Sequence, residues 1–271
     1  MNTTEDSIVE TRGLTKEFRG FRAVNDVNLK VRRGSIHALI GPNGAGKTTC
    51  FNLITKFLQP TSGAIFFKGR DITRTAPADV ARLGLVRSFQ ISATFPNLNL
   101  VENVRIALQR PLGNSFHFWR PESTLSSLDG RALELLDAVG LSEYAGLTAV
   151  ELPYGRKRAL EIATTLALDP ELLLLDEPMA GMAREDISRV SALIRKISQN
   201  RTILMVEHNM SVVADLCDQI TVLARGEVLA EGSYSVVSRN PAVIEAYMGT
   251  GQGSAESAGQ SSGNANGGAH G

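Results

Sequence analysis

The chain has 271 residues, of which 43% are hydrophobic, enough for a large buried core in one or two domains. Its 28 Lys and Arg residues balance 28 Asp and Glu residues, so no overall charge attracts nucleic acid or an anionic membrane. The N-terminus lacks the pattern of a signal peptide, and no window reaches the about 20 apolar residues that span a bilayer. Cys50 and Cys217 lie far apart without metal-ligand spacing, which indicates reduced thiols in a cytosolic protein.

The first part of the chain has the pattern of β structure, and the middle part has that of helices. Apolar residues that alternate with polar ones over 27–31 predict half-buried, antiparallel β structure leading into an apolar strand at 36–40. A second β-like segment at 64–68 follows a Pro-Thr-Ser-Gly turn. Between about 101 and 147 the pattern changes to helical segments such as 130–139, so this region is interpreted as a helical insertion.

The second half of the chain has the pattern of an α/β sheet. A helix predicted at 156–168 is ended by an Asp-Pro pair. Short apolar runs at 172–175 and 202–206 are typical of strands covered on both faces, and each follows a helical pattern, which predicts a parallel sheet. Residues 250–271 are mostly Gly, Ser, Ala, Asn and Gln, and this composition predicts a disordered tail.

The sequence GPNGAGKT directly after the strand at 36–40 is the pattern of a P-loop, which binds nucleoside triphosphates. Its glycines let consecutive backbone N–H groups turn inward, its lysine reaches the terminal phosphates, and its threonine offers a hydroxyl to Mg²⁺. The helix that follows directs its positive end at the anion. The residues expected to bind the nucleotide are Gly41, Pro42, Asn43, Gly44, Ala45, Gly46, Lys47, Thr48 and Thr49.

Two later strands end in polar residues at the edge where open parallel sheets bind ligands. After 172–175 come Asp176, placed to hold Mg²⁺, and Glu177, placed to orient or deprotonate a water that attacks the γ-phosphate. After 202–206, His208 could donate a hydrogen bond to the γ-phosphate and sense its presence. An acidic pair alone could be a helix N-terminal charge, and lone histidines are usually structural. With a P-loop upstream, the pattern favours nucleotide hydrolysis.

In this order, these motifs resemble the ATP-binding cassette (ABC) ATPases, over roughly residues 8–249. The resemblance implies an α/β P-loop fold with a mainly parallel core sheet, an N-terminal antiparallel β subdomain and a helical subdomain at roughly 91–158. It also implies that Phe18 stacks on adenine, with Phe21 as a possible substitute. Gln90 would contact Mg²⁺ or the attacking water and link the core to the helical subdomain. Without the resemblance, core packing and a surface amide would be the simpler interpretations of Phe18 and Gln90.

The segment that corresponds to the family's signature loop departs from the usual Leu-Ser-Gly-Gly-Gln. Pro153 removes both the serine hydroxyl and a backbone N–H. Gly155 and Arg156 are the residues expected to face ATP held by a second subunit. Arg156 and Lys157 oppose the helix dipole by about 0.3 to 1 kcal/mol each. Our hypothesis is that these cations replace part of the lost serine function; the alternative is two solvated basic residues.

A second departure lies after the acidic pair, where Ala183 occupies the place of a common family aspartate. Alanine cannot form the contact across subunits that the aspartate forms. Communication between two ATP sites would then be weaker, or the partner would be a different ATPase subunit with the fuller motif.

Several features look like those of importers of branched-chain amino acids: the Leu-x-Tyr-Gly signature, the long insertion before it, the Val-Glu-His-Asn-Met segment and the sequence NPAVIEAYMG at 240–249. That end predicts a short helix capped by Asn240 and stopped at Gly249. The resemblance implies ATP and Mg²⁺, a second ATPase subunit in a homodimer or heterodimer, two membrane permeases and, indirectly, a periplasmic solute-binding protein. The chain would lie on the cytoplasmic face of the membrane, where Phe95 and Leu98 would receive a permease helix.

Two alternatives stay open from the sequence. The chain could serve another transport system, such as lipopolysaccharide export or urea or amide uptake, because the ATPase does not choose the solute. It could also be a nucleotide-gated clamp with little turnover, which Pro153 and Ala183 favour and Glu177 opposes. A simple P-loop kinase would not explain Glu177, Gln90 and His208 together.

Overall fold

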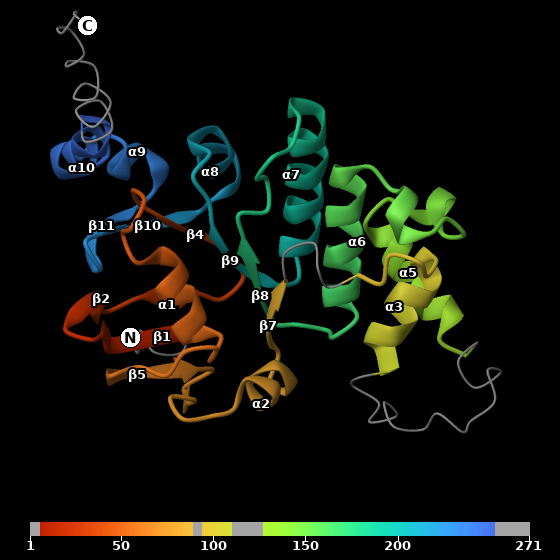
Figure 1. Cartoon of the computed structure of the whole chain (residues 1–271), viewed down its shortest axis with the longest axis horizontal. Coiled ribbons are helices and arrows are strands. Elements are labelled where there is room, and N and C mark those ends of the chain that lie inside the picture. Colours follow the sequence, from red (N-terminus) through yellow and green to blue (C-terminus); the bar gives the residue numbers. More distant parts are fainter. Residues whose placement is uncertain (1–5, 89–93, 110–126, 253–271) are drawn as a thin grey trace, which may run out of the picture.

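The N-terminal part of the chain forms an antiparallel sheet (Figure 1). The computed structural model describes residues 6–88, 94–109 and 127–252. The strand order is β2-β1-β5-β6, and β3 also pairs with β1. The strands are β1 (Ser7–Phe18), β2 (Phe21–Val27), β3 (Lys30–Arg32), β5 (Ser62–Phe67) and β6 (Arg70–Asp71). The β1–β2 hairpin closes through Arg19 and Gly20, whose φ values of 48° and 90° are those of a tight hairpin turn.

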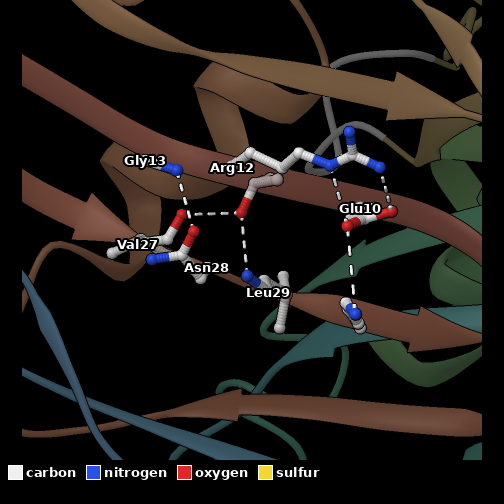
Figure 2. Close-up of polar contacts among 8 residues, drawn as sticks. Glu10, Arg12, Gly13, Val27, Asn28 and Leu29 are labelled. Atoms are coloured by element: carbon white, nitrogen blue, oxygen red, sulfur yellow. Dashed lines mark hydrogen bonds and ion pairs between the residues drawn. The ribbon is translucent and has the colours of Figure 1, made fainter.

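Side chains complete the hydrogen bonding where the chain passes from β2 to β3 (Figure 2). The Thr11 hydroxyl donates to the carbonyl oxygen of Val27 at 2.8 Å and accepts from the N–H of Leu29 at 2.9 Å. The side-chain oxygen of Asn28 accepts from the N–H of Gly13 at 2.8 Å. These bonds satisfy backbone groups that the interrupted ladder would leave unpaired. The hairpin that β1 begins is thereby held firmly to the rest of the sheet.

The core sheet has the order β11-β10-β4-β9-β8-β7. Only the β10–β11 pair is antiparallel among these neighbours; the other pairs are parallel. Its strands are β4 (Ile36–Ile40), β7 (Leu85–Ser88), β8 (Leu172–Asp176), β9 (Thr202–Val206), β10 (Gln219–Ala224) and β11 (Glu227–Gly232). Every residue of β4, β8 and β9 is buried, as expected for strands covered on both faces. The predicted α/β fold with a mainly parallel core sheet and an antiparallel β subdomain is confirmed.

Alternate residues of the central strands pack into two hydrophobic cores, one on each face of the sheet. In β8, Leu173 and Leu175 belong to the core shared with the helical region, whereas Leu172 and Leu174 belong to the core shared with the antiparallel sheet. The sheet is therefore the layer to which both other parts of the chain are attached (Figure 1).

Helices surround this sheet, and those of the middle region lie together at one end of the molecule (Figure 1). There α3 and α5 pack against α6, which in turn packs against α7 and β7. The helices are α1 (Lys47–Ile54), α2 (Pro77–Arg82), α3 (Leu100–Gln109), α5 (Asp129–Ala138), α6 (Tyr154–Leu166), α7 (Arg184–Ser198), α8 (Met210–Leu216), α9 (Tyr234–Val237) and α10 (Pro241–Gln252), with short 3₁₀ turns at Ser142–Tyr144 and Ala149–Glu151.

The ends of two predicted helices differ from expectation. Helix α6 begins at Tyr154, directly after Pro153, and not at Arg156. Helix α10 begins after Asn240, whose side chain accepts from the N–H of Ala242 at 3.0 Å, as predicted for a cap. It does not stop at Gly249 but continues to Gln252, because a glycine lowers helix stability by only about 1 kcal/mol and does not forbid the conformation. The rest of the predicted tail lies outside the described residues.

Both cysteines are free thiols, and burial raises the pKa of each to about 12. A thiol with such a pKa is almost entirely protonated at neutral pH and therefore a poor nucleophile. Within the described part of the chain, none of the helices combines the length and apolar character needed to cross a membrane.

His37 in the centre of β4 makes the stability of the fold depend on pH. Its side chain is fully buried, Nε2 lies 2.8 Å from the Thr221 hydroxyl, and burial lowers its pKa from 6.5 to about 4. Between these two values the unfolded chain binds a proton that the native chain excludes, so the free energy of unfolding falls as pH falls. From pH 7 to pH 5 this residue should remove about 2 kcal/mol.

We predict that His37→Leu reduces this loss by about 2 kcal/mol relative to the original chain, because leucine does not titrate. Urea unfolding of both proteins at pH 7 and pH 5 measures the difference. An equal loss of stability in both would contradict the assignment.

Candidate nucleotide-binding and catalytic site

The P-loop joins β4 to α1 at the carboxyl edge of the core sheet. Gly41 and Gly46 have φ values of 149° and 97°, a region that L side chains rarely adopt. A Cβ at Gly46 would lie 2.4 Å from the carbonyl oxygen of Ala23, and one at Gly41 would lie 2.1 Å from that of Leu223. These close approaches require glycine. They also show that β2 and β10 flank the loop and hold its backbone in place.

Lys47 is the first residue of α1 and lies across the P-loop. Its Nζ donates to the carbonyl oxygens of Gly41 at 2.7 Å and Pro42 at 2.9 Å. Burial lowers the pKa of this amine, and the nearby carboxylates of Glu177 and Asp176 oppose the shift. The structure thus brings together the lysine and the acidic pair that the sequence singled out.

Asp176 at the end of β8 is buried and held by an arginine of the neighbouring strand. Arg87 of β7 places Nη2 2.5 Å from Asp176 Oδ2 and Nη1 2.6 Å from Asn52 Oδ1. This fork fixes the position of the carboxylate, which is close enough to Lys47 to oppose the lowering of its pKa. The hydroxyl of Thr48, exposed in the first turn of α1, and the Asp176 carboxylate are the hard oxygen groups that Mg²⁺ prefers, so the residues present fit the metal.

Glu177 and His208 leave the ends of neighbouring strands and approach each other. The Glu177 N–H donates to the carbonyl oxygen of Val206 at 2.9 Å, which joins the end of β8 to the end of β9. His208 Nδ1 lies 3.9 Å from Glu177 Oε1, and both side chains are open to solvent, at 62% and 38% exposure. Glu177 has a φ of 44°, a strained conformation for a residue with a side chain, of the kind often found at active sites. Both polar side chains can therefore reach a ligand on the P-loop edge.

Two aromatic residues stand at the tip of the β1–β2 hairpin. Phe18 and Phe21 are cross-strand partners with 42% and 67% of their surfaces exposed. Because β2 contacts the P-loop through Ala23 and Gly46, this tip lies on the same side of the molecule as the loop. The Lys16 ammonium lies 5.0 Å from the centre of the Phe18 ring, whereas Phe21 is the more exposed of the two, so Phe21 stays an alternative to Phe18 for stacking on a base.

The departure from the usual signature sequence lies at the start of α6. Pro153 occupies the cap position, and no side chain caps the helix. A Cβ at Gly155 would lie 2.5 Å from the carboxyl carbon of Asp186, so the first turns of α6 and α7 are in close contact. The guanidinium of Arg156 lies 4.0 Å from the centre of the Tyr144 ring. Arg156 is therefore supported by an aromatic face rather than loosely solvated.

Sequence reasoning missed three charged residues that the structure places behind the site. Besides Arg87, these are Arg158 and Glu161, a buried pair of α6 with Nη1 and Oε2 2.6 Å apart. Arg158 also donates to the backbone oxygen of Asp176 at 3.2 Å, which joins the signature helix to the end of β8. Burial raises the pKa of Glu161. Their spacing is the ordinary i,i+3 of exposed helix faces, so the sequence carried no signal of burial. Gln90 lies outside the described residues.

The site combines a phosphate-binding loop at the start of a helix with an acid suited to hold a metal and a second acid suited to polarise water. This combination defines the class of P-loop nucleoside triphosphatases. Comparison with known proteins gives the family. Residues 24–180 match the family described as "ABC transporter", and residues 227–252 match "Branched-chain amino acid ATP-binding cassette transporter". The chain belongs to the ABC transporter ATPases, and it binds and hydrolyses ATP.

Similarity to individual proteins extends over nearly the whole chain. The "High-affinity branched-chain amino acid transport ATP-binding protein BraF" of Pseudomonas aeruginosa is 41% identical over 249 residues, covering 89% of this chain and 98% of that protein. The corresponding LivG of Escherichia coli is 38% identical over 252 residues, with the same coverage. A crystal structure of the ADP conformation of MJ1267, an ATP-binding cassette of an ABC transporter, superposes with a TM-score of 0.80 at 29% identity and covers 90% of this chain and 99% of that one.

We predict that breaking the buried Arg158–Glu161 pair is far more destabilising than breaking an exposed pair of the same spacing. Glu161→Gln removes the carboxylate from a buried guanidinium and should cost about 3 kcal/mol. The matched control is Glu134→Gln, which breaks the exposed Arg131–Glu134 pair of α5 and should cost less than about 0.5 kcal/mol. Denaturant unfolding measures both, and equal costs would refute the structural role of the buried pair.

The hypothesis on the signature cations stays a prediction with its own test. If Arg156 and Lys157 attract the phosphates of ATP bound to a partner subunit, the double variant Arg156→Ala, Lys157→Ala should weaken ATP-driven dimerisation several-fold. Sedimentation of Glu177→Gln protein with ATP measures this without consuming the nucleotide. The control is Arg195→Ala, Lys196→Ala, which removes two charges from the last turn of α7. Dimerisation that is unchanged in the first variant would sink the hypothesis.

Proposed function

We propose that this chain is the ATP-hydrolysing subunit of an importer of branched-chain amino acids. The observation that carries this proposal is the similarity to BraF and LivG over nearly their full lengths, together with the C-terminal match to the branched-chain amino acid transporter family. That match covers β11 and α10, whose residues line a cavity shared with the P-loop, and its family is defined by branched-chain amino acid transporters, so it favours this transport class over ABC ATPases in general.

The proposed catalytic roles follow from the positions of the side chains. The P-loop N–H groups and Lys47 bind the phosphates, while Thr48 and Asp176 would hold Mg²⁺, which would neutralise charge on the phosphates. Glu177 orients or deprotonates the attacking water, and His208 donates to the γ-phosphate. The 3.9 Å separation of His208 from Glu177 supports a shared target, because both side chains can reach one phosphate from adjacent strand ends.

The proposed partners are a second ATPase subunit and two membrane permeases, supplied by a periplasmic solute-binding protein. Gly155 and Arg156 would face ATP bound to the partner subunit, and Ala183 would leave the contact between subunits weaker than an aspartate does. With these partners, the chain would lie on the cytoplasmic face of the membrane.

A cavity of about 620 Å³ is the proposed docking site for a helix of the permease. It lies between the residues around β7 and α2 on one side and α3 and α6 on the other, and it is lined by the exposed apolar side chains of Phe57, Phe95 and Ile106. The sequence suggested Phe95 and Leu98 for this role. Phe95 lines the cavity, whereas the carbonyl of Leu98 accepts hydrogen bonds from Asn103 and Ala149 within the helical region. Phe95 is thus the better candidate.

We predict that the chain, assembled with its permeases and binding protein in vesicles, drives ATP-dependent uptake of labelled leucine. Glu177→Gln should retain ATP binding but lose both turnover and uptake by about 100-fold or more, because the amide cannot accept a proton from water. Radiolabel uptake, phosphate release and ATP binding are the measurements.

The other candidate functions give different outcomes in the same assay. Uptake of urea or a simple amide without leucine would point to a related importer, and ATP hydrolysis stimulated by lipopolysaccharide would point to export. Binding of ATP with negligible turnover in the original chain would support the nucleotide-gated clamp. Any of these results overturns the proposed function.

A further inference from the structure

Glu207 is a buried carboxylate directly behind the two residues to which hydrolysis is assigned. It follows β9, only 1% of its surface is exposed, and it precedes His208. Its Oε1 accepts from the N–H of Met179 at 3.0 Å. Its Oε2 accepts from the N–H of His208 at 3.0 Å and of Asn209 at 3.1 Å. One side chain therefore binds the backbone of two loops that are far apart in the sequence.

The two loops are those that carry the reacting side chains. Met179 lies two residues after Glu177, in the turn that leads toward α7. That turn is closed locally by the N–H of Ala180, which donates to the carbonyl oxygen of Glu177 at 3.1 Å. On the other side, Glu207 binds the N–H of His208 itself. The carboxylate is thus a bridge that joins the Glu177 loop to the His208 loop beyond the backbone bond between Glu177 and Val206.

A carboxylate suits this bridge, and an amide of the same shape does not. Both carboxylate oxygens accept, and here they receive three backbone N–H groups, which compensate the buried charge. A glutamine would present an NH₂ group to either Met179 or the His208–Asn209 pair, so donor would face donor on one side. The bridge would then hold one loop and release the other.

We propose that Glu207 is a positioning residue for ATP hydrolysis, which locks the His208 loop to the Glu177 loop so that both side chains meet the same γ-phosphate. This inference rests on the roles proposed above for Glu177 and His208. Glu207 itself does not touch the nucleotide. It acts only through the placement of its two neighbours, so its removal should alter the rate of hydrolysis and leave nucleotide binding intact.

The test is the variant Glu207→Gln in the full transporter. The expected result is a fall in kcat of about tenfold or more, with the Kd for ATP within about threefold and the thermal midpoint close to that of the original protein. In a His208→Ala background the same change should lower kcat by less than about threefold. Once the imidazole is absent, the rate of hydrolysis depends little on the position of the His208 loop.

Asn209→Ala is the matched control for general damage to the His208 loop. The Asn209 side chain caps α8 by accepting from the N–H groups of Ser211 and Val212, and the variant keeps the carboxylate bridge. It should weaken the helix cap and leave kcat within about threefold. An equal loss of kcat in Asn209→Ala, or full additivity of Glu207→Gln with His208→Ala, would overturn the proposal.

Failure of this inference is distinguishable from failure of the proposed catalytic roles. If Glu177→Gln and His208→Ala both lower kcat strongly while Glu207→Gln does not, the bridge is unimportant and the roles stand. If Glu177→Gln and His208→Ala keep normal turnover, the roles themselves are wrong, and the inference falls with them.

Discussion

The parallel hydrogen bonding of β4, β9 and β8 is the constraint on which the rest of the structure depends. These strands lie side by side and point the same way, so their carboxyl ends meet at one edge of the sheet. Lys47, His208 and the acidic pair of Asp176 and Glu177 follow those three ends. Segments separated by more than 150 residues in the chain are thereby brought to one edge of the sheet. The chemistry depends on a sheet register rather than on any local motif alone.

The same sheet connects the site to the two other parts of the molecule. One face packs against the antiparallel sheet, whose hairpin tip carries Phe18 and Phe21, and the other packs against the helical region. Arg87 and Arg158 join Asp176 to the neighbouring strand and to α6 through buried polar contacts. Burial strengthens these contacts because little water competes for them. A movement of α6 would therefore shift Asp176, the residue assigned to the metal, through its contact with Arg158.

The features that could be predicted from the sequence are those encoded in consecutive residues. The apolar runs of β4, β8 and β9, the P-loop glycines and the acidic pair are local patterns, and they placed the fold and the edge at which the polar residues meet. The ends of α6 and α10 were less well predicted because proline and glycine bias a helix boundary without fixing it. Strands β10 and β11 went unrecognised, although Arg225 and Gly226 form the tight turn between them, with φ values of 51° and 83°.

The contacts that support the site were not predictable in the same way. Arg87, Arg158 and Glu207 each interact with a segment distant in sequence, and nothing in their immediate neighbours distinguishes them from surface charges. Their roles appear only once strand order is known, because that order decides which polar group faces which backbone. Glu207 shows the difference most clearly. It reads as one of two polar residues after a strand, yet its carboxylate is buried and joins two loops.

The most direct test of the central claim is a crystal structure of the chain with Mg²⁺ and a non-hydrolysable ATP analogue. The account predicts that the Lys47 ammonium, the Asp176 carboxylate and the His208 imidazole converge on the triphosphate and its metal, with Glu177 beside the γ-phosphate. A structure in which these side chains point to different places would contradict it.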